Sequence, residues 1–329
     1  MTEGGALGPA GVLRSFSRRA DASAIAATTV LFLAFSLGTA NFLSSFNQFN
    51  VWRAASQNVF IALGQAMVVL IGGMNLSLGA IGGLSVVVIG HSMEVLGFPP
   101  FLAIGLGLAT GLVCGLLNGF FISRFRLNSF VVTLASSFIF QGLVNGISQG
   151  RPYSKIPPSF TLVGKGELFG IPNLLLLVVL ALVLVHVAFR YSVVGRQLLA
   201  TGGNAETARL SGIKTGRMVL LANVLSGLFA SLAAVLWVSR MGTAQPATGG
   251  DWLIVSFAVT VIGGTALSGG TISAPGFLFA GLLMALIRNG LIMLGVNVYF
   301  EQTYLGCIIM LAVMVEYFRT TVTGKARKL

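Results

Sequence analysis

Acidic residues are the scarcest feature of this chain, since Asp and Glu together number only 8 in 329 residues. Charged residues of either sign make up 9% of the sequence, whereas a soluble domain averages roughly 25%. The chain therefore offers little surface for water. Asp251 lies alone in a break that we expect to face outward, and neither a paired-carboxylate set nor a Ser-His-Asp set can be assembled. We expect no catalytic chemistry in this polypeptide.

Cysteine and histidine are almost as rare, with 2 residues of each. Cys114 and Cys307 lie inside apolar runs, as small hydrophobic residues do, and we expect no disulfide between them. His91 and His186 stand singly, without Cys or carboxylate companions at ligand spacing, so no metal site is predicted. The motif G-x-x-x-x-G-K-[ST], whose backbone holds nucleotide phosphates, does not occur. We therefore expect no cofactor in this chain.

Apolar residues are what the chain has in quantity, at 55% of the sequence. Many apolar runs are long enough to cross a hydrocarbon core of about 30 Å. They predict an all-α polytopic membrane protein with about ten transmembrane helices, within a range of eight to eleven. The predicted spans are 25–41, 57–74, 79–97, 100–122, 128–148, 172–190, 216–239, 252–268, 274–295 and 302–319. Residues 25–319 then form one transmembrane domain between a flexible tail (1–24) and a basic tail (320–329).

The basic residues that give the chain its net charge of +12 lie almost entirely in the breaks between these spans. With ten crossings both termini share one side, and fourteen basic residues fall on that side: Arg14, Arg18, Arg19, Arg124, Arg126, Arg190, Arg196, Arg209, Lys214, Arg217, Arg319, Lys325, Arg327 and Lys328. The other side receives five, which are Arg53, Arg151, Lys155, Lys165 and Arg240. This asymmetry is the positive-inside rule, so both termini are predicted to be cytoplasmic. It also accounts for the charge without a nucleic-acid partner.

One eight-residue pattern, GGxxLSxG, occurs twice, at Gly72–Gly79 and Gly263–Gly270. Each copy ends an apolar run, and the repetition indicates two related halves. Glycine pairs that interrupt spans at corresponding positions of two halves predict broken helices along a transport pathway. The alternative is that these small residues only permit close helix packing. Whether the halves are parallel or inverted, with a half-crossing near residues 72–84, stays open.

Neutral polar side chains on the apolar spans are a second indication of a pathway, because polar groups in lipid face a cavity or another helix. Amides and hydroxyls suit a neutral polyhydroxyl solute, although hydrogen bonding between helices is the alternative for each single residue. The predicted pathway residues are Asn58, Gln65, Gly73, Asn75, Ser77, Asn118, Thr260, Gly264, Ser268 and Asn289.

The longest outward loop, 149–171, contains Pro152, Pro157 and Pro158. Prolines and glycines at this density predict an irregular cap without helix. Such a cap could receive a partner protein, close the outer mouth, or merely connect two spans.

The cytoplasmic loop between the sixth and seventh spans contains a short helix that the sequence predicts over 205–211. Asn204 is the predicted N-cap and Gly212 the left-handed C-cap position, while Gly202 and Gly203 are expected to make a sharp entry. A capped helix presented at the membrane surface suits docking to another protein, and an ordinary amphipathic linker is the alternative.

GGNAETARLSGI resembles the cytoplasmic coupling segment of ATP-binding-cassette importer permeases of the ribose and simple-sugar branch. The matching residues are Gly202, Gly203, Asn204, Ala208, Arg209, Gly212 and Ile213. GGMNLSLGAIGG, MGTAQPATGGDW at 241–252, GGTALSGG and the run at 288–296 are also similar to family segments, so the resemblance extends over about 25–319. One departure is Asn75, where many members of the family carry Asp.

The resemblance implies a permease subunit of the bacterial inner (cytoplasmic) membrane that imports a monosaccharide. Its implied partners are a second permease subunit, identical or not, two ATP-binding subunits or one fused tandem ATPase, and an extracytoplasmic sugar-binding protein. ATP would be bound by the partner, and Glu206 would join the seven matched residues in the coupling site. A stand-alone secondary transporter or channel is the alternative, disfavoured by the capped helix and by the few intramembrane carboxylates. A membrane-embedded enzyme is a third possibility, disfavoured because no catalytic set is present.

Overall fold

The computed structural model describes residues 22–265, 269–297, 300, 302–304, 306–307 and 310, and it is all-α apart from one short hairpin. The helices are α2 Ala22–Gly38, α3 Ser45–Val69, α4 Leu78–Glu94, α5 Pro100–Phe125, α6 Ser129–Ser148, α7 Pro158–Lys165, α8 Asn173–Tyr191, α9 Val193–Gly203, α10 Ala205–Leu210, α11 Thr215–Met241, α12 Trp252–Ile262 and α13 Ala274–Met293. Strands β1 Glu167–Leu168 and β2 Ile171–Pro172 pair antiparallel.

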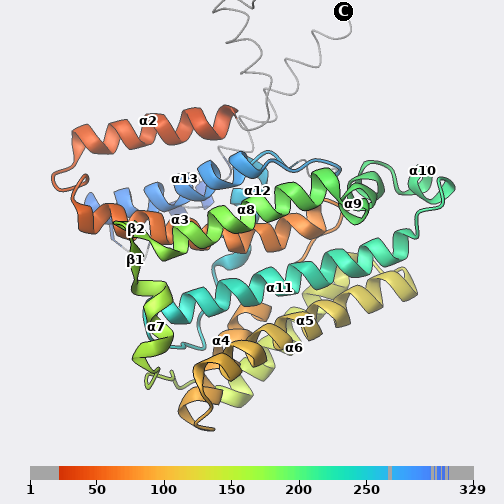
Figure 1. Cartoon of the computed structure of the whole chain (residues 1–329), viewed down its shortest axis with the longest axis horizontal. Coiled ribbons are helices and arrows are strands. Elements are labelled where there is room, and N and C mark those ends of the chain that lie inside the picture. Colours follow the sequence, from red (N-terminus) through yellow and green to blue (C-terminus); the bar gives the residue numbers. More distant parts are fainter. Residues whose placement is uncertain are drawn as a thin grey trace, which may run out of the picture.

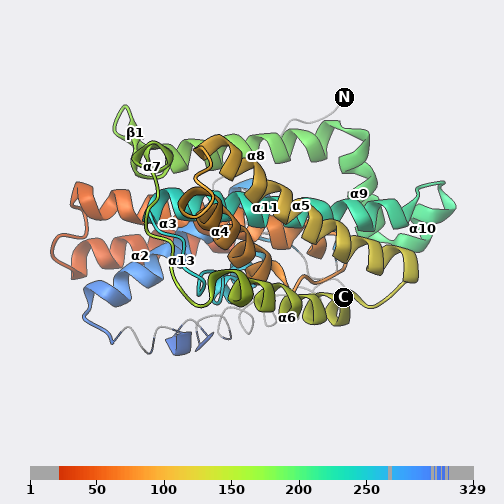
Figure 2. The same ribbon diagram turned by 90° about the horizontal axis from the view of Figure 1, so that it is seen from below.

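The long helices run side by side, so that the molecule has two distinct ends (Figure 1). Helices α9 and α10 lie at one end, and α7 with the β1–β2 hairpin lies at the other (Figures 1 and 2). The same separation is visible after the 90° turn in Figure 2, so it does not arise from one viewing direction. We call the end with α9 and α10 the coupling end, after the role that the sequence predicts for α10, and the end with α7 and the hairpin the cap end.

Five described helices are long and apolar enough to cross a membrane, as judged by length and composition: α5, α6, α8, α11 and α13. The apolar helices Ala24–Gly38, Leu78–Glu94 and Trp252–Ile262 are shorter. Helix α3 has 25 residues but also carries amides such as Gln57 and Gln65, which lower its hydropathy. Most of the span predicted at 302–319 lies outside the described residues, so ten crossings remain a prediction.

Helices α5 and α11 approach each other through glycine. Gly111, Gly115 and Gly119 recur every four residues along α5 and face the backbone of α11. A Cβ atom on Gly119 would lie 2.9 Å from the Leu220 carbonyl oxygen, and one on Gly115 would overlap the Asn223 carbonyl oxygen. Such spacing lets helix backbones pack closely in lipid, where burial of apolar surface supplies little driving force.

The expectation that 149–171 contains no helix is wrong, because Pro158–Lys165 forms α7. Proline is compatible with the first helical position, where its missing N–H would have no intrahelical acceptor. Pro157 is the N-cap residue and Pro158 begins the helix. The Ser239 hydroxyl joins this helix to α11 by donating to the Phe160 carbonyl at 2.7 Å and accepting from the Gly164 N–H at 2.8 Å. The cap is therefore ordered against α11.

Candidate functional site

The first GGxxLSxG copy lies in a non-helical segment between two helices. Helix α3 ends at Val69 and α4 begins at Leu78. Gly72 has φ +76°, a left-handed conformation that glycine adopts without steric cost. An α-helix cannot continue through a residue in this conformation, so Gly72 keeps α3 from running on into α4.

A chain of buried hydrogen bonds fixes this broken segment. The Asn118 amide on α5 donates to the Ser77 hydroxyl at 2.8 Å, and the Ser77 hydroxyl donates to the Asn75 side-chain oxygen Oδ1 at 2.7 Å. The Asn75 amide in turn donates to the Ser226 hydroxyl on α11 at 2.9 Å. All four side chains are buried, with Asn75 only 1% exposed. The network joins α5, the break and α11, and three of its members were predicted pathway residues.

Helix α6 supports the same segment from another direction. The Ser129 hydroxyl accepts from the Met74 N–H at 3.2 Å, and the Thr133 hydroxyl accepts from the Leu76 N–H at 3.0 Å. These bonds satisfy backbone N–H groups that have no helical partner in the break. The broken segment is thus held by side chains from three helices.

The second copy begins where α12 ends, at Ile262. Gly264 has φ +87°, and the Thr265 N–H donates to the Thr260 carbonyl at 3.1 Å. The Thr265 hydroxyl is buried and has no hydrogen-bond partner among the described residues. Ser268 lies outside the described residues, so its predicted role stays a prediction.

The other predicted pathway residues are distributed along the bundle. Asn289 exchanges two hydrogen bonds with Asn47, at 2.7 and 3.2 Å. The Asn58 amide donates to the Gly281 carbonyl at 3.3 Å, and the Thr260 hydroxyl donates to the Ala62 carbonyl at 3.2 Å. Both amide atoms of Gln65 are buried without a partner in the described part of the chain. Gln65 is therefore the predicted residue whose hydrogen-bonding groups remain available.

The cap end brings together charges that are far apart in the sequence. Arg288 forms an ion pair with Asp251 at 2.7 Å, which corrects the expectation that Asp251 has no partner. The Arg240 guanidinium lies 3.2 Å from the Gln57 side-chain oxygen. These contacts depend on how α3, α11 and α13 pack, and no local sequence pattern could have predicted them.

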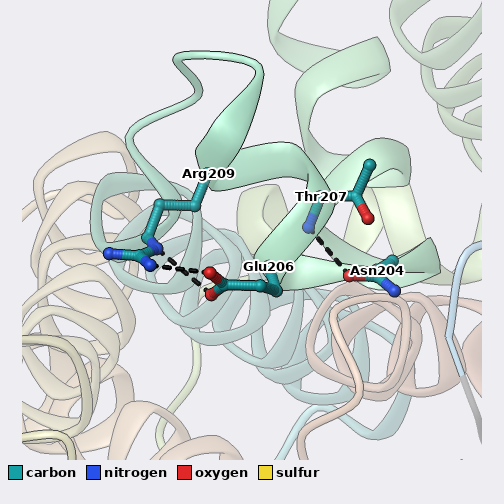
Figure 3. A network of polar contacts seen from close by, with 4 residues as sticks. All are labelled: Asn204, Glu206, Thr207 and Arg209. Carbon is teal, nitrogen blue, oxygen red and sulfur yellow. Dashed lines mark hydrogen bonds and ion pairs between the residues drawn. The ribbon is translucent and has the colours of Figure 1, made fainter.

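The coupling end has the capped helix that the sequence predicts. The Asn204 side chain accepts from the Thr207 N–H at 2.8 Å (Figure 3). Gly212 has φ +83°. Gly202 and Gly203, however, are the last residues of α9 and do not form a sharp entry. Asn204 makes the turn instead, because its extended φ of −160° interrupts the helix.

Helix α10 presents a charged face to solvent. Two hydrogen bonds join Arg209 to Glu206, at 2.6 and 3.1 Å (Figure 3). Hydrogen bonding to Arg209, with its positive charge, lowers the pKa of Glu206. Ala208, on the opposite face, is only 4% exposed. The burial of Ala208 and the exposure of the ion pair fix which face of α10 a partner could reach.

A cationic groove of about 560 Å³ lies beside α10. Its cations are Arg124 from α5, Arg209 from α10, Lys214 from the connecting loop and Arg217 from α11. Phe120 and Leu220 line its apolar part. The groove and α10 together form one exposed surface with an excess of positive charge.

Comparison with known proteins gives consistent matches over most of the chain. Residues 47–316 match the model of the family described as branched-chain amino acid transport system / permease component. The chain is 35% identical over 289 residues to the ribose import permease of Bacillus subtilis (strain 168), which covers 87% of this chain and 89% of the relative. It is 31% identical over 283 residues to the D-allose transport system permease of Escherichia coli (strain K12), with coverage of 85% and 86%.

The L-arabinose transport system permease of Escherichia coli (strain K12) is 30% identical over 294 residues, which are 88% of each chain. No solved structure gives a significant match.

Proposed function

Because this chain belongs to the family of permease components of branched-chain amino acid transport systems, we propose that it is the permease subunit of an ATP-binding-cassette importer. In this proposal a separate ATPase docks on α10 and the adjoining groove, and the chain itself binds no nucleotide. The observation that carries the proposal is the exposed helix α10, which is capped by Asn204 and presents Glu206 and Arg209 on one face. A short rigid helix with a fixed charge pattern is suited to a groove on another protein.

We propose a monosaccharide as the solute. Relatives of this chain are named for ribose, D-allose and L-arabinose. The neutral amides and hydroxyls on the spans agree with a neutral polyhydroxyl solute, since such a solute needs both donors and acceptors. A solute-binding protein would deliver the sugar at the cap end, where the exposed α7 and β1–β2 hairpin lie.

The proposed assembly contains two permease subunits, two ATP-binding subunits or one tandem ATPase, and the sugar-binding protein. It lies in the bacterial inner membrane with ten crossings per permease and with both termini in the cytoplasm. Contacts with the ATPase come from exposed side chains of α10, whereas the neighbouring glycines shape the backbone.

Reconstitution in proteoliposomes tests this function. The chain is incorporated with its ATPase, and uptake of radiolabelled ribose, allose and arabinose is measured with the binding protein outside. We expect uptake of one of these sugars that needs ATP hydrolysis and stops when the ATPase is omitted. Uptake that continues without the ATPase would instead identify a stand-alone transporter or channel.

A further inference from the structure

The end of α9 touches the backbone of two distant segments at one carbonyl group. The Gly270 N–H donates to the Leu70 carbonyl oxygen at 2.9 Å. A Cβ atom on Gly202 would overlap that same oxygen, and one on Gly269 would lie 2.7 Å from it. Gly202, Gly269 and Gly270 therefore meet around the Leu70 carbonyl with no side chain between them. This contact is called the glycine junction below.

The three segments of the glycine junction are those that the sequence singles out. Leu70 is the first residue of the broken segment and lies two residues before the first GGxxLSxG copy. Gly269 and Gly270 end the second copy, and Gly202 lies two residues before Asn204, the N-cap of α10. The broken segment that contains the first copy, the end of the second copy and the residues before α10 thus share one contact.

Replacement by other residues is sterically restricted at this contact. Gly269 and Gly270 have φ +86° and +81°, which side-chain-bearing residues rarely adopt. A Cβ on Gly269 would also lie 2.8 Å from the Gly202 carbonyl oxygen, closer than such atoms pack. Because closely packed backbones resist compression, a displacement of α9 must move the segments at Leu70 and Gly270 or break their contact with it.

We propose that Gly202 is a positioning residue for transport: through the glycine junction it passes the movement of α10 to both broken segments. The proposal rests on the function proposed above, in which α10 contacts the ATPase. It assigns Gly202 to the interior of the permease and not to the ATPase interface. Gly105 on α5 has a different environment, since it is exposed and an added Cβ would meet nothing within 4 Å.

Gly202→Ala and Gly105→Ala make the same chemical change, one at the glycine junction and one away from it. Membrane abundance, co-purification of the ATPase, basal ATP hydrolysis and sugar uptake are measured for each in proteoliposomes. We expect Gly202→Ala to co-purify with the ATPase but to lose uptake about tenfold or more, a range typical of coupling between sites. Gly105→Ala should match the wild type in all four measurements. Normal uptake by Gly202→Ala, or an equal loss in both variants, would overturn the proposal.

If Gly202→Ala fails to insert into the membrane, a second measurement that leaves Gly202 unchanged tests the proposal. Spin labels at Gly203→Cys and Thr271→Cys, both exposed positions beside the junction, report its integrity by their separation. We expect the same separation in the nucleotide-free and ATP-bound complexes, because the junction moves as one unit. Separation of the labels on ATP binding would contradict the proposal. A wild-type chain that never binds the ATPase would instead refute the proposed function itself.

Discussion

Asn75 connects more hydrogen-bonding groups of the broken segment than any of its predicted companions. It accepts from both the N–H and the hydroxyl of Ser77, at 3.0 and 2.7 Å, and donates to Ser226. The donors run in one direction, from Asn118 to Ser77 to Asn75 to Ser226, and such chains strengthen each member. An amide both accepts and donates, whereas an Asp carboxylate at this position could not donate to Ser226. The residue is therefore well suited to hold the break in place.

We expect Asn75→Ala to lower stability, because it leaves the buried Ser77 hydroxyl without its acceptor and the buried Ser226 hydroxyl without its donor. The loss should be about 1–3 kcal/mol, measured as a lower melting temperature in detergent. Asn145→Ala is the control, since Asn145 is exposed and has only a 3.5 Å contact with Gln141. Uptake by the surviving fraction separates two roles: a raised half-saturating sugar concentration indicates solute contact, and an unchanged one indicates a scaffold. An unchanged melting temperature would show that the network is not stabilising.

For single residues, the sequence could identify candidate site residues but not the side chains with which they form hydrogen bonds. Asn75, Ser77 and Asn118 could be predicted because polar side chains on apolar spans are conspicuous. Ser226 was not singled out, because a serine in an apolar helix is common and gains meaning only when Asn75 is placed beside it. The Asp251–Arg288 pair was missed for the same physical reason.

At the scale of single helices, the sequence predicted correctly the features that depend on residues close to one another in the chain. The caps of α10 were predictable because Asn204 and Gly212 act within one turn of the helix that they delimit. Helix α7 was missed because its prolines were counted without regard to position. Helix α9 was also missed; its end at Gly202 packs on Leu70 and Gly270, which are distant in the sequence.

Charge reversal on α10 tests the docking face. Glu206→Lys and Arg209→Glu each replace one member of an exposed ion pair and leave the buried Ala208 in place. We expect normal insertion and several-fold weaker binding of the ATPase, measured by titration of the purified subunits, because complementary charges fix the register of an interface.

The ion pair on α10 predicts that binding of the ATPase weakens as the pH falls. The pKa of Glu206 is lowered by Arg209, so the ion pair persists below the usual titration range of glutamate and is lost as the pH falls through the lowered pKa.

Reversal of a charge outside the docking face, such as Glu167→Lys in β1, is the control. Unchanged affinity in both α10 variants would remove α10 from the interface.

The α5–α11 contact gives two predictions for stability: alanine at a packed glycine lowers it, and alanine at an open glycine does not. A Cβ on Gly115 would overlap the Asn223 carbonyl oxygen and lie 3.0 Å from the Val224 Cα atom, so Gly115→Ala should destabilise the protein by about 1–3 kcal/mol. Gly105 is on the same helix, but a Cβ there would meet nothing within 4 Å. Gly105→Ala should be neutral or stabilise by up to about 1 kcal/mol, since glycine is a poor helix former. Thermal unfolding that ranks the two variants in the reverse order would exclude close glycine packing.

At the scale of the whole molecule, the class of protein could be predicted and the number of crossings could not. Long apolar runs identified α5, α6, α8, α11 and α13 directly. Helix α3 is different, because its amides lower its hydropathy although the helix is buried against neighbours that the sequence does not reveal. The arrangement also gives the molecule a direction, with α10 at the coupling end and the β1–β2 hairpin at the cap end (Figure 1).

That direction is the central claim, and cysteine labelling and cross-linking in intact cells test it most directly. Leu210 on α10 is 78% exposed and Phe169 in the hairpin is 94% exposed, so each can carry a single reactive cysteine once the exposed Cys307 is replaced by serine. We expect Leu210→Cys to cross-link to the ATPase and to be shielded from a membrane-impermeant thiol reagent. Phe169→Cys should react with that reagent from outside and never cross-link to the ATPase. Labelling of Leu210→Cys from outside, or cross-linking of Phe169→Cys to the ATPase, would contradict the account.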